Sequence, residues 1–281
     1  MIKPNLLVIG AMKCASTSLH NYLDLHPKIQ MSEPKELEFF SSEENFSKGL
    51  EWYSQFFDLQ YPLRGESSTN YTKRHRFKNV PERINETLGS NVKLIYIVRD
   101  PIERFQSHFT DSKTYGHTPS NCDINITVEN LSFDDHILQT SKYYYQVKEY
   151  LQIFDKKEVY FLKSEDLKHD PQSTLNKVFK FLEVDLIEII KIESNLSKTK
   201  SYPSSGYAQF INIRSIKSLK KLLPNSLISD LKNSILIKKI SRKKIDPSID
   251  TLSSQSREKL RNLLREDLKL FKDETGIDYL K

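Results

Sequence analysis

The sequence predicts an α/β protein, a single domain of residues 1–281 in which helices flank a central parallel β-sheet. Short apolar runs alternate with amphipathic stretches, and this alternation is typical of a parallel sheet covered on both faces. A chain of 281 residues is long enough to bury a full core of this kind. Ligands bind such sheets at the carboxyl ends of the strands, so the residues after each strand are the first candidates for a functional site.

The individual elements follow from local patterns. Apolar runs rich in β-branched and aromatic residues predict strands at residues 5–10, 63–67, 92–98 and 157–163. Apolar residues at helical spacing predict helices at residues 16–25, 141–154, 171–182 and 253–273. Another helix is expected to begin at Pro101, with Asp100 as its cap. Residues 110–132 are polar and irregular, which indicates a surface loop or a lid.

Composition narrows the class of protein. With 37% hydrophobic and 28% charged residues the chain is typical of a globular protein, and no stretch approaches the roughly 20 apolar residues of a membrane-spanning helix. The N-terminus passes directly into the first strand, so we expect no signal peptide. Two cysteines, Cys14 and Cys122, provide neither a disulfide framework nor a metal cluster. We therefore expect a cytoplasmic protein without a bound metal.

The net charge of +6 is unevenly distributed. Residues 214–244 contain ten lysines and arginines and one acid, Asp230. This basic segment indicates a surface that faces an anion, such as an acidic glycan or the anionic inner face of a membrane, while a solvated helix face remains open as the alternative. Residues 214–244 are expected to form an insertion in the domain or a subregion on its acceptor side. Peripheral contact with a membrane is expected through these residues.

The segment Gly10–Ser18 is the strongest candidate for a phosphate site. A buried strand turns through small residues into a helix, so several backbone N–H groups and the helix dipole converge there, and Lys13 adds a full charge. A Walker A loop would place Lys and Ser/Thr where this chain has Ser16 and Thr17, and only Thr17 fits. An ordinary turn capped by Ser16 or Thr17 remains the alternative.

This segment resembles the 5′-phosphosulfate loop of sulfotransferases that use the donor 3′-phosphoadenosine 5′-phosphosulfate (PAPS). The resemblance implies that the loop holds the 5′-phosphate and that Lys13 acts on the reacting group. The implied donor-binding residues of this loop are Lys13, Cys14, Ala15, Ser16, Thr17 and Ser18. Ala15 replaces a common glycine, a change that matters if this position requires positive φ.

Two later segments resemble the parts of the same family that bind the 3′-phosphate. Arg99–Ser107 matches the pattern Arg-(Asp/Asn)-Pro-x-x-Arg-x-x-Ser, which implies that Arg99 and Ser107 are ligands. A guanidinium suits this role because it binds phosphate in a bidentate manner, although a lone arginine more often pairs with an acid. Residues 197–203 resemble a late loop of the heparan sulfate branch, which implies further donor contacts from Ser197, Lys198, Thr199 and Lys200.

Two charged residues are implied in the chemistry by resemblance to the heparan sulfate branch. Glu66, at the end of the second predicted strand, matches a glutamate that accepts the proton of the acceptor. A structural ion pair of Glu66 with Arg64 or Lys13 is the alternative. Residues 33–40 resemble the stretch Pro-Lys-Glu-x-x-Phe-Phe, whose lysine is close to the reacting sulfate, so Lys35 is a candidate for charge stabilisation.

Together these segments identify the chain as similar to PAPS-dependent sulfotransferases, which implies the P-loop-kinase-like sulfotransferase fold. The resemblance also implies in-line sulfuryl transfer to a hydroxyl or amine of a carbohydrate or glycolipid, without nucleic acid as a partner. The residues themselves support only an α/β protein that binds a nucleotide phosphate. A nucleotide-dependent kinase, or a non-catalytic module that binds an acidic glycan or a membrane, remains the alternative.

Overall fold

A computed structural model describes residues 1–189, 201–203, 242–244 and 247–280 of the protein. The chain groups into two compact units. The first comprises Met1–Arg104, Phe133–Ser194 and Arg261–Lys281, and the second comprises Phe105–Ser132 and Asn195–Leu260. The expectation that residues 1–281 form one domain stays a prediction.

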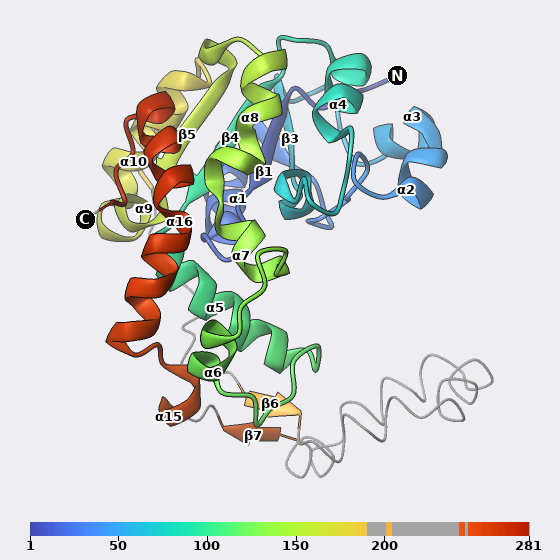
Figure 1. Ribbon diagram of the computed structural model, residues 1–281. Coiled ribbons are helices and arrows are strands. Elements are labelled where there is room, and N and C mark those ends of the chain that lie inside the picture. The colour runs from blue at the N-terminus through green and yellow to red at the C-terminus, as the bar shows by residue number, and fades with distance from the viewer. Residues whose placement is uncertain (190–200, 204–241, 245–246, 281) are drawn as a thin grey trace, which may run out of the picture. The chain divides into compact units, whose positions relative to one another are not determined.

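The first unit is built on a five-stranded parallel sheet in the order β2-β3-β1-β4-β5, with helices flanking it (Figure 1). The four strands expected from the sequence are present as β1 (Leu6–Gly10), β3 (Leu63–Ser67), β4 (Lys93–Val98) and β5 (Val159–Lys163). The prediction of a parallel α/β sheet is therefore confirmed. The edge strand β2 (Ile29–Met31) was not predicted, because its three residues are too few to show a pattern.

The register of the sheet brings three loops to one edge. Leu7 of β1 is opposite Glu66 of β3 on one side and Leu94 of β4 on the other. Since all three strands run in the same direction, the segments that follow Gly10, Ser67 and Val98 leave the sheet at this edge. The chain also changes sides beside β1, from β2 and β3 to β4 and β5, which is where open α/β sheets bind ligands.

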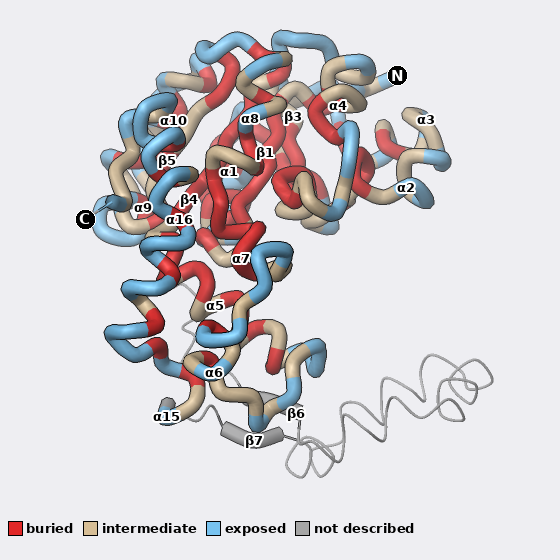
Figure 2. The backbone as a smooth tube through the Cα atoms, in the orientation of Figure 1, coloured by how far each residue is buried: buried red, intermediate tan, exposed pale blue. Residues whose placement is uncertain are grey.

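The core of the first unit is formed by the central strands and the rings packed on them. Leu6–Gly10 are all buried, as are Leu94–Val98 (Figure 2). The ring of Tyr96 on β4 contacts the ring of Tyr143, with centroids 6.1 Å apart, and Tyr143 contacts Phe271 at 5.5 Å. These contacts fix the helices that carry Tyr143 and Phe271 against the sheet.

The helices agree closely with the sequence expectations. Those expected at residues 16–25, 141–154, 171–182 and 253–273 are α1 (Ser16–Asp24), α8 (Tyr143–Ile153), α10 (Pro171–Phe181) and α16 (Ser254–Thr275). The shorter helices are α2 (Glu43–Ser47), α3 (Gly49–Ser54), η1 (Thr69–Thr72), α4 (Val80–Leu88), α7 (His136–Ser141), η2 (Lys156–Glu158), α9 (Ser164–His169) and α15 (Pro247–Asp250).

The region 110–132 differs from its prediction as a loop. Helix α5 (Pro101–Thr114) extends into it, and α6 (Ile124–Glu129) lies within it. Asp123 begins α6, because its side chain accepts a hydrogen bond of 2.7 Å from the N–H of Asn125, while Ile124 and Val128 are buried. The apolar face of α6 is only two residues wide, so the polar composition concealed it.

The described part of the second unit is held by a buried ion pair. Lys113 of α5 donates to the carboxylate of Asp250 over 2.5 Å, and both side chains are almost fully enclosed. In the same unit a two-stranded antiparallel sheet joins β6 (Ser201–Pro203) to β7 (Arg242–Lys244). The remainder of the basic segment 214–244 lies outside the described residues.

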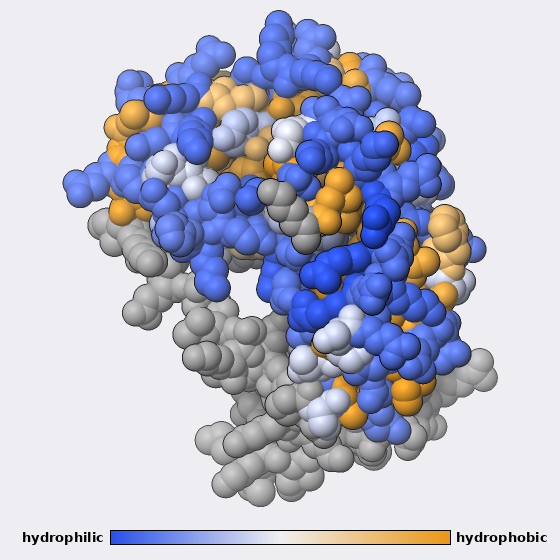
Figure 3. All heavy atoms as spheres, turned by 60° about the vertical axis from the view of Figure 1, so that its left-hand side comes forward, coloured by the Kyte–Doolittle hydropathy of each residue, from blue (hydrophilic) through white to orange (hydrophobic). Residues whose placement is uncertain are grey.

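The surface visible in Figure 3 is mostly hydrophilic, with apolar side chains scattered over it. Among the described residues, no helix is long and apolar enough to cross a membrane.

Helix α8 is capped at its amino end by a residue of α16. The carboxylate of Asp267 accepts hydrogen bonds from the N–H groups of Tyr144, over 3.0 Å, and Tyr145, over 2.8 Å. Burial raises the pKa of Asp267 to about 6, and the two backbone donors oppose this shift. The cap therefore fixes the start of the helix that carries Tyr143.

Replacing Asp267 should lower the stability of the protein. Asp267→Ala leaves two N–H groups of α8 without an acceptor, so we expect a loss of about 1–2 kcal/mol in the free energy of unfolding. Urea denaturation at pH 7.5 measures this loss, with exposed Asp273→Ala on the same helix as the control. Equal midpoints for the two variants would contradict the capping role.

Candidate active site

The loop between β1 and α1 adopts a conformation suited to an anion. Lys13 has φ of 68° and Ala15 has φ of 66°, both in the left-handed region. Ala15 is also the N-cap of α1, and its methyl group cannot accept a hydrogen bond from the helix. The alternative in which Ser16 or Thr17 caps an ordinary turn is therefore not the geometry observed. A left-handed non-glycine residue costs about 1–2 kcal/mol, and such strain concentrates at functional sites.

The side chain of Cys14 faces the core rather than the loop's open side. Its thiol is fully buried and lies 3.6 Å from the hydroxyl of Tyr143. Burial raises the pKa of this thiol to about 11. The thiol of Cys14 is therefore turned away from any ligand of the loop, and its backbone N–H donates to the carbonyl of Ala11 over 3.2 Å.

A close approach couples this loop to η1. A Cβ atom on Gly10 would be only 2.1 Å from Oγ1 of Thr72, and that hydroxyl donates a hydrogen bond of 2.9 Å to the carbonyl of Ile9. Glycine is therefore required at the end of β1. The contact places the end of η1 directly against the start of the phosphate loop.

Arg99 follows β4 directly, at the same edge of the sheet. Asp100 caps α5 as expected, because its Oδ1 accepts hydrogen bonds of 2.9 Å from the N–H groups of Ile102 and Glu103. The Arg99 side chain is 35% exposed, and its Nη2 lies 3.7 Å from Oε2 of Glu103. The alternative expectation for Arg99, an ion pair with a neighbouring acid, is thus met by Glu103. The Arg99 side chain nevertheless stays partly accessible to a ligand.

For the other predicted ligands in the two motifs for the 3′-phosphate, no position relative to the phosphate loop is described. Ser107 lies on α5 but belongs to the second unit, so the structure gives no geometry between it and the phosphate loop. The predicted ligands Ser197, Lys198, Thr199 and Lys200 lie outside the described residues. Arg104, the second arginine of the Arg99 motif, is fully buried and donates to Oγ of Ser141 and to the carbonyl of Ile137. It therefore holds α7.

Glu66 occupies an enclosed position at the end of β3. Its side chain is fully buried, and its Oε1 accepts hydrogen bonds from the hydroxyls of Tyr53, over 2.5 Å, and Tyr71. Oε2 accepts a hydrogen bond of 3.1 Å from Ser68. Burial raises the pKa of Glu66 to about 7, although the three hydroxyl donors oppose the shift. The Glu66 carboxylate is thus held by hydroxyl groups, and Arg64 donates instead to the carbonyls of Lys3 and Tyr61.

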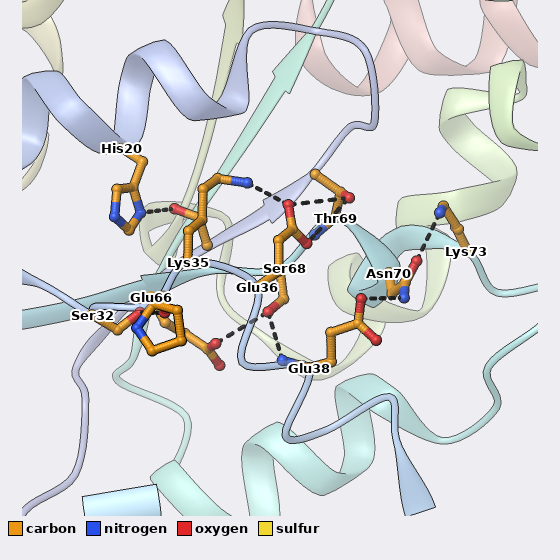
Figure 4. A network of polar contacts seen from close by, with 12 residues as sticks. His20, Ser32, Lys35, Glu36, Glu38, Glu66, Ser68, Thr69, Asn70 and Lys73 are labelled. Atoms are coloured by element: carbon orange, nitrogen blue, oxygen red, sulfur yellow. Dashed lines mark hydrogen bonds and ion pairs between the residues drawn. The ribbon is translucent and has the colours of Figure 1, made fainter. Parts of the chain in front are cut away.

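A second carboxylate, Glu36, lies nearer the solvent in the same network (Figure 4). Its side chain is 33% exposed, pairs with Lys35, and accepts a hydrogen bond of 2.8 Å from the N–H of Thr69. Glu36 also has φ of 64°, a strained value for a glutamate. Glu36 contributes to the raised pKa of Glu66, so the two carboxylates are close enough to interact.

The network continues from this loop towards η1. The N–H of Glu38 donates to Ser68, Asn70 donates to Glu38 over 2.6 Å, and Lys73 donates to Asn70 over 2.7 Å. Burial lowers the pKa of Lys73 to about 8. The loop after β2 and the segment after β3 are thus joined by polar side chains at the edge where the phosphate loop begins.

Sequence reasoning assigned no role to Glu36, Tyr53 or Tyr143. Glu36 belongs to the same sequence stretch as Lys35. Its exposure to solvent, beside the buried Glu66, depends on the fold and could not be predicted from that stretch. Tyr53 and Tyr143 are distant in sequence from the residues they contact, and no local pattern indicates which hydroxyl finds which partner. These three residues could be found only from the structure.

His20 is the histidine of α1 that contacts the end of β3. Nδ1 of His20 lies 2.8 Å from the hydroxyl of Ser67. Burial, helped by the charge of Lys35, lowers the pKa of His20 to about 4, so this side chain is neutral near pH 7. In the described ranges no group of three or more His, Cys, Asp or Glu side chains is arranged to hold a metal ion.

These features define an α/β protein whose sheet edge is suited to a ligand with phosphate or sulfate groups. Residues 3–265 match the family model described as the sulfotransferase domain. Because this match covers most of the chain, the protein belongs to the sulfotransferase family of enzymes.

Known proteins of this family resemble the chain in sequence and fold. Heparan sulfate glucosamine 3-O-sulfotransferase 5 of Mus musculus is 29% identical over 195 residues, which cover 64% of this chain and 53% of the relative. The chain thus matches about half the length of this curated relative. A crystal structure of a sulfotransferase from Alicyclobacillus acidocaldarius has a TM-score of 0.67 at 17% identity, covering 99% of this chain and 98% of the other.

A mouse sulfotransferase, SULT7A1, complexed with PAP, has a TM-score of 0.52 at 17% identity, with 95% of this chain and 85% of the other covered. At such low identity these structures show the fold alone. They confirm the expectation of the sulfotransferase fold, with its parallel sheet and helices on either side.

The raised pKa of Glu66 predicts a specific pH dependence of stability. The folded protein holds this proton up to about pH 7, whereas the unfolded chain releases it near pH 4.5. Stability contributed through Glu66 is therefore complete below about pH 4.5 and is lost as the pH rises through 7. The wild type should lose stability relative to Glu66→Gln over this range.

Urea denaturation of both proteins between pH 4.5 and 8 measures this difference. Exposed Glu86→Gln is the matched control, and its stability should run parallel to that of the wild type. If Glu66→Gln also ran parallel, the carboxyl would titrate at an ordinary pKa in the folded protein.

Proposed function

We propose that this protein transfers the sulfuryl group of PAPS to a hydroxyl or amine of a carbohydrate or glycolipid. One observation carries the proposal. Two segments suited to anions, the loop of Lys13 and the residue Arg99, leave the carboxyl ends of the adjacent strands β1 and β4. A donor with a 5′- and a 3′-phosphate matches this pair of sites, and the PAP bound to a protein of the same fold supports the choice of ligand.

The roles at the donor follow from charge and position. The backbone N–H groups of Lys13–Ser18, apart from that of Cys14, which donates to Ala11, hold the 5′-phosphate at the amino end of α1. The ammonium of Lys13 neutralises the bridging oxygen as its bond to sulfur breaks and adenosine 3′,5′-bisphosphate (PAP) leaves with the electron pair. Arg99 binds the 3′-phosphate. Ser107 and Lys198 are assigned to the same group by resemblance alone, and no metal is given a role.

The proton of the acceptor must pass to a carboxylate as its oxygen or nitrogen bonds to sulfur. Glu66 is the base that the resemblance predicts, but both of its oxygens are occupied by hydroxyl donors and its side chain is fully enclosed. Glu36 is partly exposed and stands beside Lys35, the expected stabiliser of charge on the sulfate. We therefore favour Glu36 as the base, with Glu66 as the buried anchor of the network.

The acceptor is proposed from the relative's printed name, which describes a sulfotransferase acting on heparan sulfate glucosamine. A carbohydrate is thus the first substrate to test. The basic segment 214–244 is proposed to meet an acidic glycan or the inner face of a membrane, and the compartment is proposed to be the cytoplasm.

Binding of the donor product tests the proposal directly. The wild type should bind PAP in the presence of EDTA, and Arg99→Ala should weaken this binding by about 10- to 100-fold, because a phosphate loses a bidentate charged partner. Calorimetry measures both dissociation constants. Exposed Arg265→Ala removes the same charge elsewhere and should bind like the wild type.

Two results would redirect the proposal. Binding that requires Mg²⁺ and ATP would indicate a nucleotide-dependent kinase. Failure to bind either nucleotide, with retained binding of an acidic glycan or anionic vesicles, would indicate a non-catalytic module.

Activity of two glutamine variants distinguishes the candidate bases. Glu36→Gln should lower kcat by about 10²- to 10⁴-fold with unchanged affinity for PAP, because a general base contributes this much. Glu66→Gln should reduce kcat less. Transfer of radioactive sulfate from PAPS to a glucosamine oligosaccharide provides the assay. The opposite order of the two variants, together with loss of the wild type's acid limb near pH 7 in Glu66→Gln, would assign the base to Glu66.

A further inference from the structure

Three polar contacts meet at the hydroxyl of Tyr143, on the first residue of α8. The hydroxyl donates a hydrogen bond of 2.6 Å to the carbonyl of Arg99. Its oxygen accepts from the N–H of Arg99 over 3.4 Å and lies 3.6 Å from the thiol of Cys14. The side chain of Tyr143 is fully buried, whereas Arg99 is half-buried.

This arrangement uses both the proton and the oxygen of one hydroxyl, and the Cys14 thiol beside it also lies 3.7 Å from the carbonyl of Met12. A tyrosine hydroxyl has one proton and two acceptor positions. The proton goes to the Arg99 carbonyl, which leaves the oxygen to face the Arg99 N–H and the Cys14 thiol. Arg99 is thus held by both of its backbone polar groups, while the thiol of the phosphate loop rests against the same atom.

The position of Tyr143 is itself fixed from several sides. Its ring packs on Tyr96 of β4 and on Phe271 of α16, and Asp267 caps the two residues that follow it. The hydroxyl is therefore a fixed point to which the segment after β1 and the segment after β4 are both attached.

We propose that Tyr143 is a positioning residue for the donor, whose hydroxyl sets the backbone of Arg99 at a fixed distance from the phosphate loop. The proposal rests on the function proposed above, in which these segments bind the 3′- and 5′-phosphates of one nucleotide. The ribose limits the distance between the two phosphates to a narrow range, so the two segments must keep a matching separation. A hydroxyl that contacts both segments supplies this constraint without touching the nucleotide.

The proposal predicts a selective loss in Tyr143→Phe. Without the hydroxyl, the carbonyl of Arg99 lacks its donor and the residue can move. We expect the dissociation constant of PAP to rise about tenfold. That of adenosine 5′-monophosphate, which has no 3′-phosphate, should change less than about threefold. Calorimetry or displacement of PAP measures both ligands.

Tyr150→Phe is the matched control. Tyr150 lies on the same helix, is equally buried, and also donates from its hydroxyl to a backbone carbonyl, that of Tyr71, over 2.9 Å. Both phenylalanine variants should lose similar amounts of thermal stability. Only Tyr143→Phe should lower the preference for PAP over adenosine 5′-monophosphate.

The double variant Arg99→Ala/Tyr143→Phe shows whether Tyr143 acts through Arg99. If it does, Tyr143→Phe costs little further PAP affinity once Arg99 has become alanine, so the two effects are not additive. Additive effects, or a Tyr143→Phe protein that binds both nucleotides like Tyr150→Phe, would overturn the positioning role while leaving the donor site intact. A wild type that does not prefer PAP over adenosine 5′-monophosphate would instead overturn the proposed function, and this inference with it.

Discussion

The parallel pairing of β1 with both β3 and β4 is the constraint on which the rest of the site depends. It brings the segments after Gly10, Ser67 and Val98 to one edge of the sheet, although the first and the last of them are separated by more than 80 residues along the chain. Because the central strands are buried on both faces, a shift of register would disrupt the packing of side chains on each face, so the edge is fixed by packing in the first unit. The packing of the core thus fixes the positions of the segments that are proposed to contact the ligand.

Polar groups at this edge divide into two layers. The inner layer is enclosed and satisfied within the protein, as with Glu66 between Tyr53 and Tyr71, and Tyr143 against Arg99. The outer layer, which includes Glu36 and the Arg99 guanidinium, keeps partial access to solvent. The backbone of Glu36 has a strained φ value. Its side chain is held by the N–H of Thr69 and by the ammonium of Lys35.

Much of this architecture could be predicted from the sequence, because strands such as Lys93–Val98 and a cap such as Asp100 carry their signals within a few residues. The possible need for positive φ at Ala15 could also be foreseen, and the structure has φ of 66° there. What could not be predicted depends on contacts between distant segments. The enclosure of Glu66 requires Tyr53 from α3, and the three-residue strand β2 exists only because β3 pairs with it. The helix at Ile124–Glu129 was missed because its buried face has only two members.

The inward orientation of Cys14 has a consequence for the chemical resistance of the protein. A thiol whose pKa is about 11 is ionised in only about one molecule in ten thousand at pH 7. Alkylating reagents and peroxides react with the thiolate, and this one is also out of contact with solvent. The phosphate loop is therefore one where a cysteine tolerates air and electrophiles, so labels directed at thiols will modify the partly exposed Cys122 first.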